Sequence, residues 1–153
     1  SSGSQFVSTI PITGILSLRA SATAIASLRV SMTKTASGRL FIDLIPQTLP
    51  IEPVVELVHQ FHGAKPLAVA SGGTREIVTK ILSALGILKK FDAVITTEDY
   101  RQGKPAPDPF LEAARRLGVA PERCLVFEDT TAGIAAAKAA GMQWVLVEPP
   151  TRR

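Results

Sequence analysis

The chain has 153 residues, a length that supports one compact core and argues against several large domains. Apolar residues make up 46% of the chain and charged residues 20%, a balance typical of globular proteins that argues against a wholly disordered chain. The formal net charge is +4, but the basic residues are scattered and form no stripe with interleaved aromatic residues, so we expect no nucleic-acid partner.

The composition changes near residue 50, which separates two unlike halves. Residues 1–49 are rich in Ser, Thr, Ala, Ile and Leu, and Asp43 is the only acid among them. We expect this half to be an atypical segment, with three alternatives: a remnant of another domain such as a cap, an organelle transit peptide, or a folded element that its pattern does not identify. Residues 50–153 are expected to form the main domain.

Short β-rich runs alternate with amphipathic stretches from residue 50 onward. In chain order, the spacing predicts a helix over 52–61, a strand over 67–70, a helix over 74–85, a strand over 91–96, a helix over 108–117, a strand over 123–127, a helix over 132–140 and a strand over 143–147. This alternation predicts a three-layer α/β/α sandwich around a parallel, Rossmann-like sheet.

The first polar group that we expect to carry chemistry is Ser71-Gly72-Gly73-Thr74, between a strand and a helix. Ligands of open parallel sheets bind beyond the carboxyl ends of the strands. A hydroxyl with backbone N–H groups at such an end suits a phosphate oxygen. The alternative is a simple turn followed by a helix cap.

The second group is Lys104, in the loop 103–109 that contains three prolines. Proline fixes φ and lowers the entropy lost when a loop is ordered, so the ammonium of Lys104 can be held in position for a phosphoryl group. The alternative is a solvated loop lysine.

The third group is the pair Glu128 and Asp129 at the end of a predicted buried strand. Adjacent carboxylates repel each other and cost desolvation unless a cation compensates. Mg²⁺ prefers one or two carboxylates together with water and substrate phosphate, so the pair suits this metal. The alternative is that Asp129 or Thr130 only caps the following helix.

Together, the three groups resemble the haloacid dehalogenase-like superfamily in order and spacing. The sequences Gly-Lys-Pro-Ala-Pro-Asp at 103–108 and Phe-Glu-Asp-Thr-Thr-Ala-Gly-Ile at 127–134 look like its beta-phosphoglucomutase-like and sugar-phosphatase branch. The resemblance covers roughly residues 50–148 and implies the fold expected above. It also implies roles for five residues: phosphoryl binding by Ser71 and the Gly72 amide, charge neutralisation by Lys104, and Mg²⁺ binding by Glu128 and Asp129.

The resemblance also implies a motif that this sequence lacks. Family members open with a hydrophobic strand that ends in Asp-x-Asp-Gly, whose first aspartate is phosphorylated and whose second is the general acid/base. No Asp-x-Asp occurs in the 153 residues, and no helical cap is recognisable. Asp43, in the strand-like run 40–44, is a partial substitute and a candidate nucleophile, although Ile45 stands in the second aspartate's place; the alternative is the tail of a cap.

The missing strand would lie at the centre of the sheet, between the strands that end at Ser71 and Phe127. Unpaired backbone groups in its neighbours would cost on the order of 1 to 3 kcal/mol each. We therefore expect that residues 39–45 fill the central position, or that the isolated chain is poorly stable.

The function implied by the resemblance is a Mg²⁺-dependent phosphatase or phosphomutase that acts on a small sugar phosphate through an aspartyl-phosphate intermediate. Because the nucleophile motif is missing, we expect little or no turnover by this chain. The competing hypotheses are a non-catalytic phosphate-binding or interaction module on the same fold, and an incomplete gene product without a function of its own.

The remaining residues of interest have simpler interpretations. Cys124 is the only cysteine, which excludes an internal disulfide and favours a reducing, cytoplasmic location; its apolar neighbours predict a buried side chain. His59 and His62 lack a third ligand and are expected at the solvated end of a helix. Trp144 is expected in the core. No apolar run is long enough to predict a membrane span, and no feature predicts the oligomeric state.

Overall fold

The computed structural model describes residues 13–18 and 52–148. In chain order its elements are β1 (Thr13–Leu18), α3 (Glu52–Phe61), β2 (Leu67–Ser71), α4 (Arg75–Ala84), the 3₁₀ turn η3 (Leu88–Lys90), β3 (Ala93–Ile95), α5 (Asp108–Leu117), the 3₁₀ turn η4 (Pro121–Arg123), β4 (Cys124–Glu128), α6 (Thr131–Ala139) and β5 (Gln143–Leu146). None of the helices in these ranges has the length and apolar composition needed to cross a bilayer.

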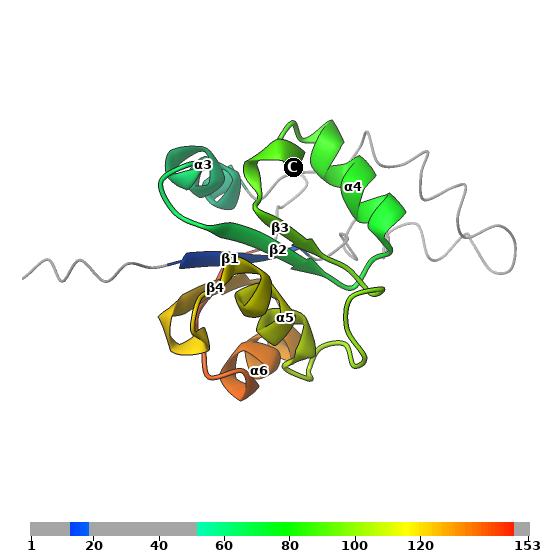
Figure 1. Cartoon of the computed structure of the whole chain (residues 1–153), viewed down its shortest axis with the longest axis vertical. Helices are drawn as coiled ribbons and strands as arrows, with labels where there is room; N and C mark the ends of the chain where they lie inside the picture. The colour runs from blue at the N-terminus through cyan, green and yellow to red at the C-terminus, as the bar shows by residue number, and fades with distance from the viewer. Residues whose placement is uncertain (1–12, 19–51, 149–153) are drawn as a thin grey trace, which may run out of the picture.

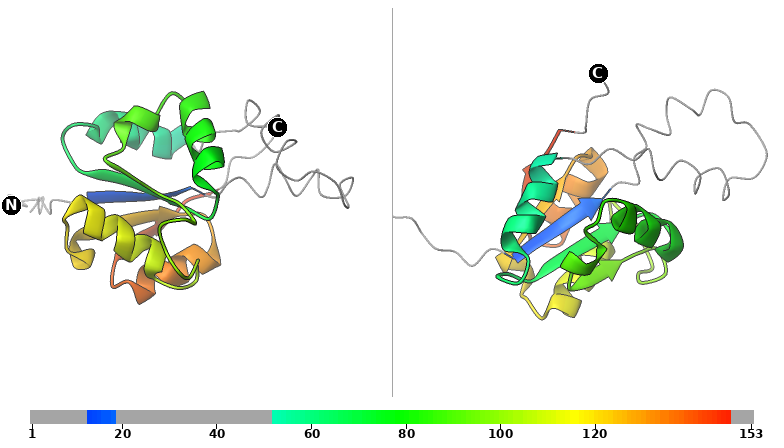
Figure 2. Two further views of the ribbon diagram at one scale, coloured as in Figure 1. Left: turned by 45° about the vertical axis from the view of Figure 1, so that its right-hand side comes forward. Right: turned by 90° about the horizontal axis from the view of Figure 1, so that it is seen from above.

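The five strands form one parallel sheet in the order β3-β2-β1-β4-β5. Helices α3 and α4 cover one face of this sheet, and α5 and α6 cover the other (Figures 1 and 2). The predicted three-layer α/β/α sandwich with a parallel sheet is therefore confirmed.

Strand β2 explains how a short apolar run supports both layers, because all five of its residues are buried. Leu67 and Val69 belong to the apolar cluster beneath α3 and α4, whereas Ala68 and Ala70 belong to the cluster beneath α5 and α6. Successive strand side chains point to opposite faces, so a strand covered on both sides is apolar throughout.

The predicted helices over 52–61 and 108–117 are confirmed to the residue, and the other predicted elements of the main domain are present with small shifts. Helix α5 ends at Gly118, whose φ of 66° lies in the left-handed region that favours glycine. Strand β3 begins later than predicted, at Ala93, and the preceding Asp92 is bonded to the first residue of β2 instead. Its backbone N–H donates to the Leu67 carbonyl, and its carboxylate accepts from the Leu67 N–H.

The central strand is Thr13–Leu18, so the expectation that residues 39–45 fill this position was wrong. The other alternative, a poorly stable chain, stays a prediction. β1 pairs with β2 on one side and with β4 on the other, and Leu16 is in register with both Val69 and Phe127. Both candidate segments are short apolar runs, and periodicity within one run does not reveal its pairing partners. Asp43 lies outside the described residues.

Trp144 is a second correction, because 40% of this residue is exposed. It lies on β5, the edge strand, all four residues of which are exposed. The Lys138 ammonium lies 4.9 Å from the centroid of the Trp144 ring. This apolar run therefore forms an edge strand whose residues are exposed.

Candidate functional site

The carboxyl ends of β2, β1 and β4 lie side by side at one edge of the sheet, because the strands are parallel and neighbouring. Ser71 ends β2 and Glu128 ends β4. Between them, β1 contributes Ser17, in register with Ala70 and one residue beyond the Leu16–Phe127 pair. This edge therefore collects two of the three polar groups identified in the sequence.

Lys104 reaches the same edge from the loop between β3 and α5. Its Nζ lies 3.0 Å from Oε2 of Glu128 and donates to the Ala70 carbonyl at 3.4 Å. The lysine side chain is 16% exposed and the glutamate side chain 1%. The solvated-lysine alternative is therefore wrong: the ammonium is held across the ends of β2 and β4, on either side of β1.

Phe110 of α5 lies beside the Lys104 side chain. The Lys104 ammonium lies 5.0 Å from the centroid of this fully buried ring, a distance suited to a cation–π interaction. The Lys104–Pro105 peptide bond is cis. The position of the ammonium is thus set by an aromatic ring as well as by a carboxylate.

Glu128 accepts four hydrogen bonds. Oε1 accepts from the backbone N–H groups of Asp129 and Thr130 and from the Thr130 hydroxyl, each at 3.0 Å, and Oε2 accepts from Lys104. Three of these four donors reach Oε1, so the carboxylate is held in one orientation while Oε2 faces the ammonium. Glu128 therefore ties the ammonium to the first turn of α6.

Gly133 makes this arrangement possible. A Cβ built at Gly133 would lie 1.9 Å from both Cδ and Oε2 of Glu128. No side chain fits at that distance, so the carboxylate occupies the space that any larger residue would need. Thr130, rather than Asp129, caps α6, because its hydroxyl accepts from the Gly133 N–H at 2.9 Å.

Ser71 is buried, with 1% exposure, and both its side chain and its carbonyl are hydrogen-bonded. Its Oγ accepts from the Gly73 N–H at 3.2 Å, which closes a turn of the kind serine favours. The Tyr100 hydroxyl donates to the Ser71 carbonyl at 3.0 Å. A simple turn therefore accounts for part of the serine's contacts and is compatible with a further role.

Asp99 anchors the start of the loop that carries Lys104. It accepts from the Thr96 N–H at 2.8 Å and forms ion pairs with Arg75 of α4 and Arg116 of α5. Burial alone would raise the pKa of Asp99, but the hydrogen bonds from Thr96 and Arg116 outweigh it and lower the pKa to about 2. The loop is thereby fixed to a helix on each face of the sheet.

The residues at this edge suit Mg²⁺ in part. Asp129 is half-buried beside Glu128 and supplies a hard carboxylate oxygen, the donor that Mg²⁺ prefers. Glu128 faces the same edge, and its Oε2 accepts from the Lys104 ammonium. Within the described ranges, no group of three or more His, Cys, Asp or Glu residues is arranged to hold a metal ion. A magnesium ion held here would take Asp129 as a ligand, together with water and the phosphate itself.

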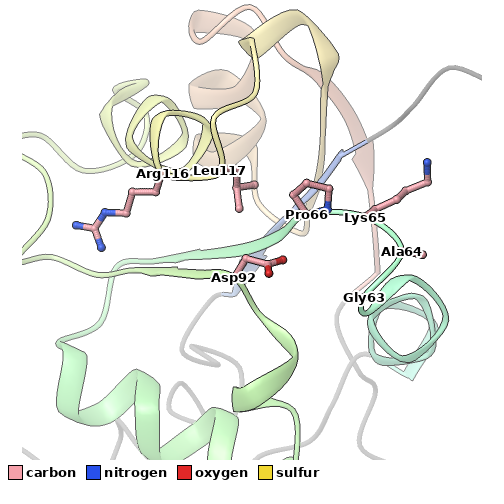
Figure 3. Close-up of a pocket in the computed structure, with 7 residues that line it drawn as sticks. All are labelled: Gly63, Ala64, Lys65, Pro66, Asp92, Arg116 and Leu117. Carbon is pink, nitrogen blue, oxygen red and sulfur yellow. The ribbon is translucent and has the colours of Figure 1, made fainter.

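A surface cavity of about 360 Å³ lies at the opposite end of the strands (Figure 3). It is lined by residues that precede β2 and β3 and by the last turn of α5, including Lys65, Asp92 and Arg116. Arg116 is already paired with Asp99 and Glu112. The polar groups identified from the sequence do not line this cavity, so we do not assign it to the candidate site.

Unlike the expectation for Trp144, those for Cys124, His59 and His62 agree with the structure. Cys124 is buried, and this burial raises the pKa of its thiol, as expected for an unreactive core residue. His59 and His62 are exposed on the surface, where the Nδ1 of His62 lies 3.1 Å from the Lys90 carbonyl.

Three contributors to this edge were not identified from the sequence: Tyr100, Phe110 and Gly133. Phe110 and Tyr100 flank the Lys104 loop, but an aromatic residue near a loop predicts core packing as readily as a site contact. Gly133 follows the capping Thr130 by three residues, and a glycine within the first turn of a helix is a sign of close approach.

A model of the haloacid dehalogenase-like hydrolase family matches residues 20–141. Fructose-1-phosphate phosphatase YqaB of Escherichia coli (strain K12) is 46% identical over 93 residues, which cover 61% of this chain and 50% of that protein. Validoxylamine A 7'-phosphate phosphatase of Streptomyces hygroscopicus subsp. limoneus is 38% identical over 99 residues, which cover 64% of this chain and 46% of that protein. The chain thus spans about half the length of these curated relatives.

Solved structures agree with this match. Beta-phosphoglucomutase of Clostridium difficile superposes with a TM-score of 0.61 at 27% identity, covering 69% of this chain and 48% of that one. CbbY of Rhodobacter sphaeroides, solved in complex with phosphate, superposes with a TM-score of 0.67 over 90% of this chain and 87% of that one; its 20% identity supports the fold alone. On the family match and the fold together, the chain belongs to the haloacid dehalogenase-like hydrolase family.

Proposed function

We propose that the chain binds the phosphate group of a small phosphorylated sugar at the edge formed by Ser71, Lys104 and Asp129, and that it hydrolyses this ester slowly or not at all. The observation that carries the proposal is the position of the Lys104 ammonium. It is nearly buried, spans the ends of β2 and β4, and lies beside the strand end of Ser71. A cation held at converging strand ends is suited to a phosphate dianion.

Each residue has a distinct proposed role. The Lys104 ammonium neutralises phosphate charge, while the Ser71 hydroxyl and the Gly72 N–H bind phosphate oxygens. Asp129 holds Mg²⁺, which would supply further neutralisation of the phosphate oxygens. Because Glu128 bonds both the Lys104 ammonium and the first turn of α6, we give it the task of holding Lys104 rather than that of a direct metal ligand.

The weak turnover follows from the residue at the central strand. Register puts Ser17 level with Ala70, whose carbonyl accepts from Lys104. A family nucleophile would be an aspartate at the end of this strand, and no Asp-x-Asp occurs in the sequence. A serine at this position lacks the carboxylate needed for an aspartyl-phosphate. This observation favours the competing hypothesis from the sequence, a phosphate-binding module without catalysis.

The proposed ligand class rests on the relatives. Two of them are a fructose-1-phosphate phosphatase and a validoxylamine A 7'-phosphate phosphatase. Both names describe phosphate esters of polyhydroxylated molecules, so we propose a ligand of that class for this chain.

Cytoplasmic location stays a prediction from the single cysteine.

Turnover and binding are tested separately. The chain is incubated with Mg²⁺ and fructose 1-phosphate while released inorganic phosphate is measured, and binding of the same ester is followed by calorimetry. We expect saturable binding with little or no release. Rapid release of phosphate would refute the proposed weak turnover. If this release persists in Asp43→Asn, the nucleophile is a residue other than Asp43. An absence of binding would refute the site itself.

A further inference from the structure

Tyr100 and Ser71 are 29 residues apart in the sequence but joined by a hydrogen bond at the candidate site. The Tyr100 hydroxyl donates to the Ser71 carbonyl at 3.0 Å. This carbonyl and the N–H of Gly72 belong to one planar peptide unit, and the cis bond described above is at Lys104–Pro105, not here. In a planar trans peptide the C=O and N–H groups point in opposite directions, so fixing one fixes the other.

The direction of this peptide follows from the strand order. Tyr100 comes from the segment after β3, on the β3 side of β2, and β1 lies on the other side of β2. A Ser71 carbonyl held by Tyr100 therefore directs the Gly72 N–H away from Tyr100, toward the β1 side. That is also the side where Lys104 spans the strand ends.

We propose that Tyr100 is a positioning residue for phosphate binding, because its hydroxyl holds the Ser71–Gly72 peptide with the Gly72 N–H directed at the phosphate position. The inference rests on the proposed function and assigns a role to a residue that does not itself touch the ligand. A hydrogen bond to the carbonyl also polarises the peptide and strengthens its N–H as a donor.

Two further observations make Tyr100 suited to this task. Burial, with the nearby carboxylates of Glu98 and Asp99, raises the pKa of Tyr100, so its hydroxyl keeps its proton throughout the neutral range. Its ring packs against the core cluster beneath α5 and α6 and lies 3.8 Å from the position of a Cβ at Gly103, the residue before Lys104. One side chain thus bonds the strand end of Ser71 and lies near the start of the Lys104 loop.

The test compares Tyr100→Phe, which removes only the hydroxyl, with Thr97→Val. Thr97 donates to the Gly73 carbonyl through both its hydroxyl, at 3.3 Å, and its backbone N–H, at 3.2 Å. The valine variant therefore also loses one hydroxyl from the same loop, while the Gly73 carbonyl keeps a donor. Calorimetry measures the affinity for inorganic phosphate with Mg²⁺, and NMR measures the Ser71 carbonyl carbon and Gly72 amide nitrogen shifts without ligand.

We expect Tyr100→Phe to move both shifts in the ligand-free chain and to weaken phosphate binding by about three- to tenfold, the usual range for one lost hydrogen bond. Thr97→Val should change neither quantity appreciably, and both variants should keep similar melting temperatures.

Two results would overturn the role of Tyr100. Unchanged Ser71 and Gly72 shifts in Tyr100→Phe would mean that the hydroxyl does not hold the peptide. Changed shifts with an affinity equal to that of Thr97→Val would mean that the peptide does not govern phosphate binding. If the unmodified chain binds no phosphate, the proposed function fails with the positioning role, whereas the ligand-free shifts still decide whether Tyr100 orients the peptide.

Discussion

Lys104 and Glu128 form a nearly buried ion pair, with 3.0 Å between Nζ and Oε2, across the ends of two strands that do not touch each other. Taking both charges out of water is costly, and their attraction offsets this cost only when hydrogen bonds complete the geometry. Glu128 meets that condition through three further donors from Asp129 and Thr130. The pair therefore links the Lys104 loop to the first turn of α6 and holds the cation in place.

Removing one partner of this pair should be costly. We expect Lys104→Met to lower the free energy of unfolding by roughly 3 kcal/mol, the lower end for a broken buried pair, because Glu128 keeps three donors. Glu128→Gln should lower the free energy of unfolding much less in the Lys104→Met variant than in the unmodified chain. Urea unfolding of all four forms measures the coupling, and additive losses would contradict a coupled pair.

Gly133→Ala should destabilise the chain although the same change usually stabilises a helix by up to about 1 kcal/mol. The added Cβ would lie 1.9 Å from Glu128, so the carboxylate must move and its hydrogen bonds must break. Ala135→Gly, at an exposed position of α6, measures the helix propensity alone. Thermal melts compare the two variants; a stabilised Gly133→Ala chain would show that Glu128 does not occupy this space.

Stability should fall in acid through Asp99 and Glu112. Hydrogen bonds from Arg115 and Arg116 lower the pKa of Glu112 from its usual 4.5 to about 2, and the pKa of Asp99 is lowered from 3.8 to about 2. Because the unfolded chain binds these protons at higher pH than the folded chain does, the stabilisation is present above about pH 4.5 and is lost as the pH falls toward 2.

The variant Asp99→Asn isolates part of this dependence. We expect it to be less stable at neutral pH by on the order of 2 kcal/mol and to lose less stability between pH 5 and pH 2 than the unmodified chain. Urea unfolding at several pH values measures both quantities. Parallel stability curves for the two chains would show that Asp99 does not contribute to the acid sensitivity.

The main domain was largely predictable because its elements alternate with clear boundaries. Helix 108–117 has an amphipathic pattern, two prolines at its start and Gly118 at its end, so its limits were predicted to the residue. The polar groups at Ser71 and Glu128 were predictable because they follow buried strands. Parallel topology then brings such ends to one edge without further information.

The central strand and the supporting contacts were not predictable in the same way. Thr13–Leu18 and residues 39–45 are both short apolar runs, and only pairing with β2 and β4 distinguishes them. The Tyr100–Ser71 and Lys104–Glu128 contacts join residues 29 and 24 apart in the sequence. Such contacts depend on the packed loop, and local spacing does not encode them.

Ser17→Asp should introduce the carboxylate that the central strand lacks. With p-nitrophenyl phosphate and Mg²⁺, we expect a carboxylate oxygen of the new aspartate to bond to phosphorus as the bond to nitrophenolate breaks. Nitrophenolate is a good leaving group and needs no proton from the protein. The expected readout is a burst of nitrophenolate equal to the protein, with a phosphorylated protein detected by mass spectrometry.

Ser17→Asn is the matched control for that experiment, since it has the same shape without a nucleophilic carboxylate. It should give neither the burst nor the phosphorylated protein. A Ser17→Asp chain that is folded and binds phosphate, yet gives no burst, would contradict the assignment of position 17 to the attacking group.

The claim on which the proposed function depends is that Lys104 holds a phosphate ion at the ends of β2 and β4. Calorimetric titration of inorganic phosphate into the chain with Mg²⁺, repeated with Lys104→Met, tests it most directly. The account predicts saturable binding by the unmodified chain that falls at least about tenfold in the variant, as expected for a lost charged contact. Equal affinities in the two titrations, or no heat of binding in either, would contradict it.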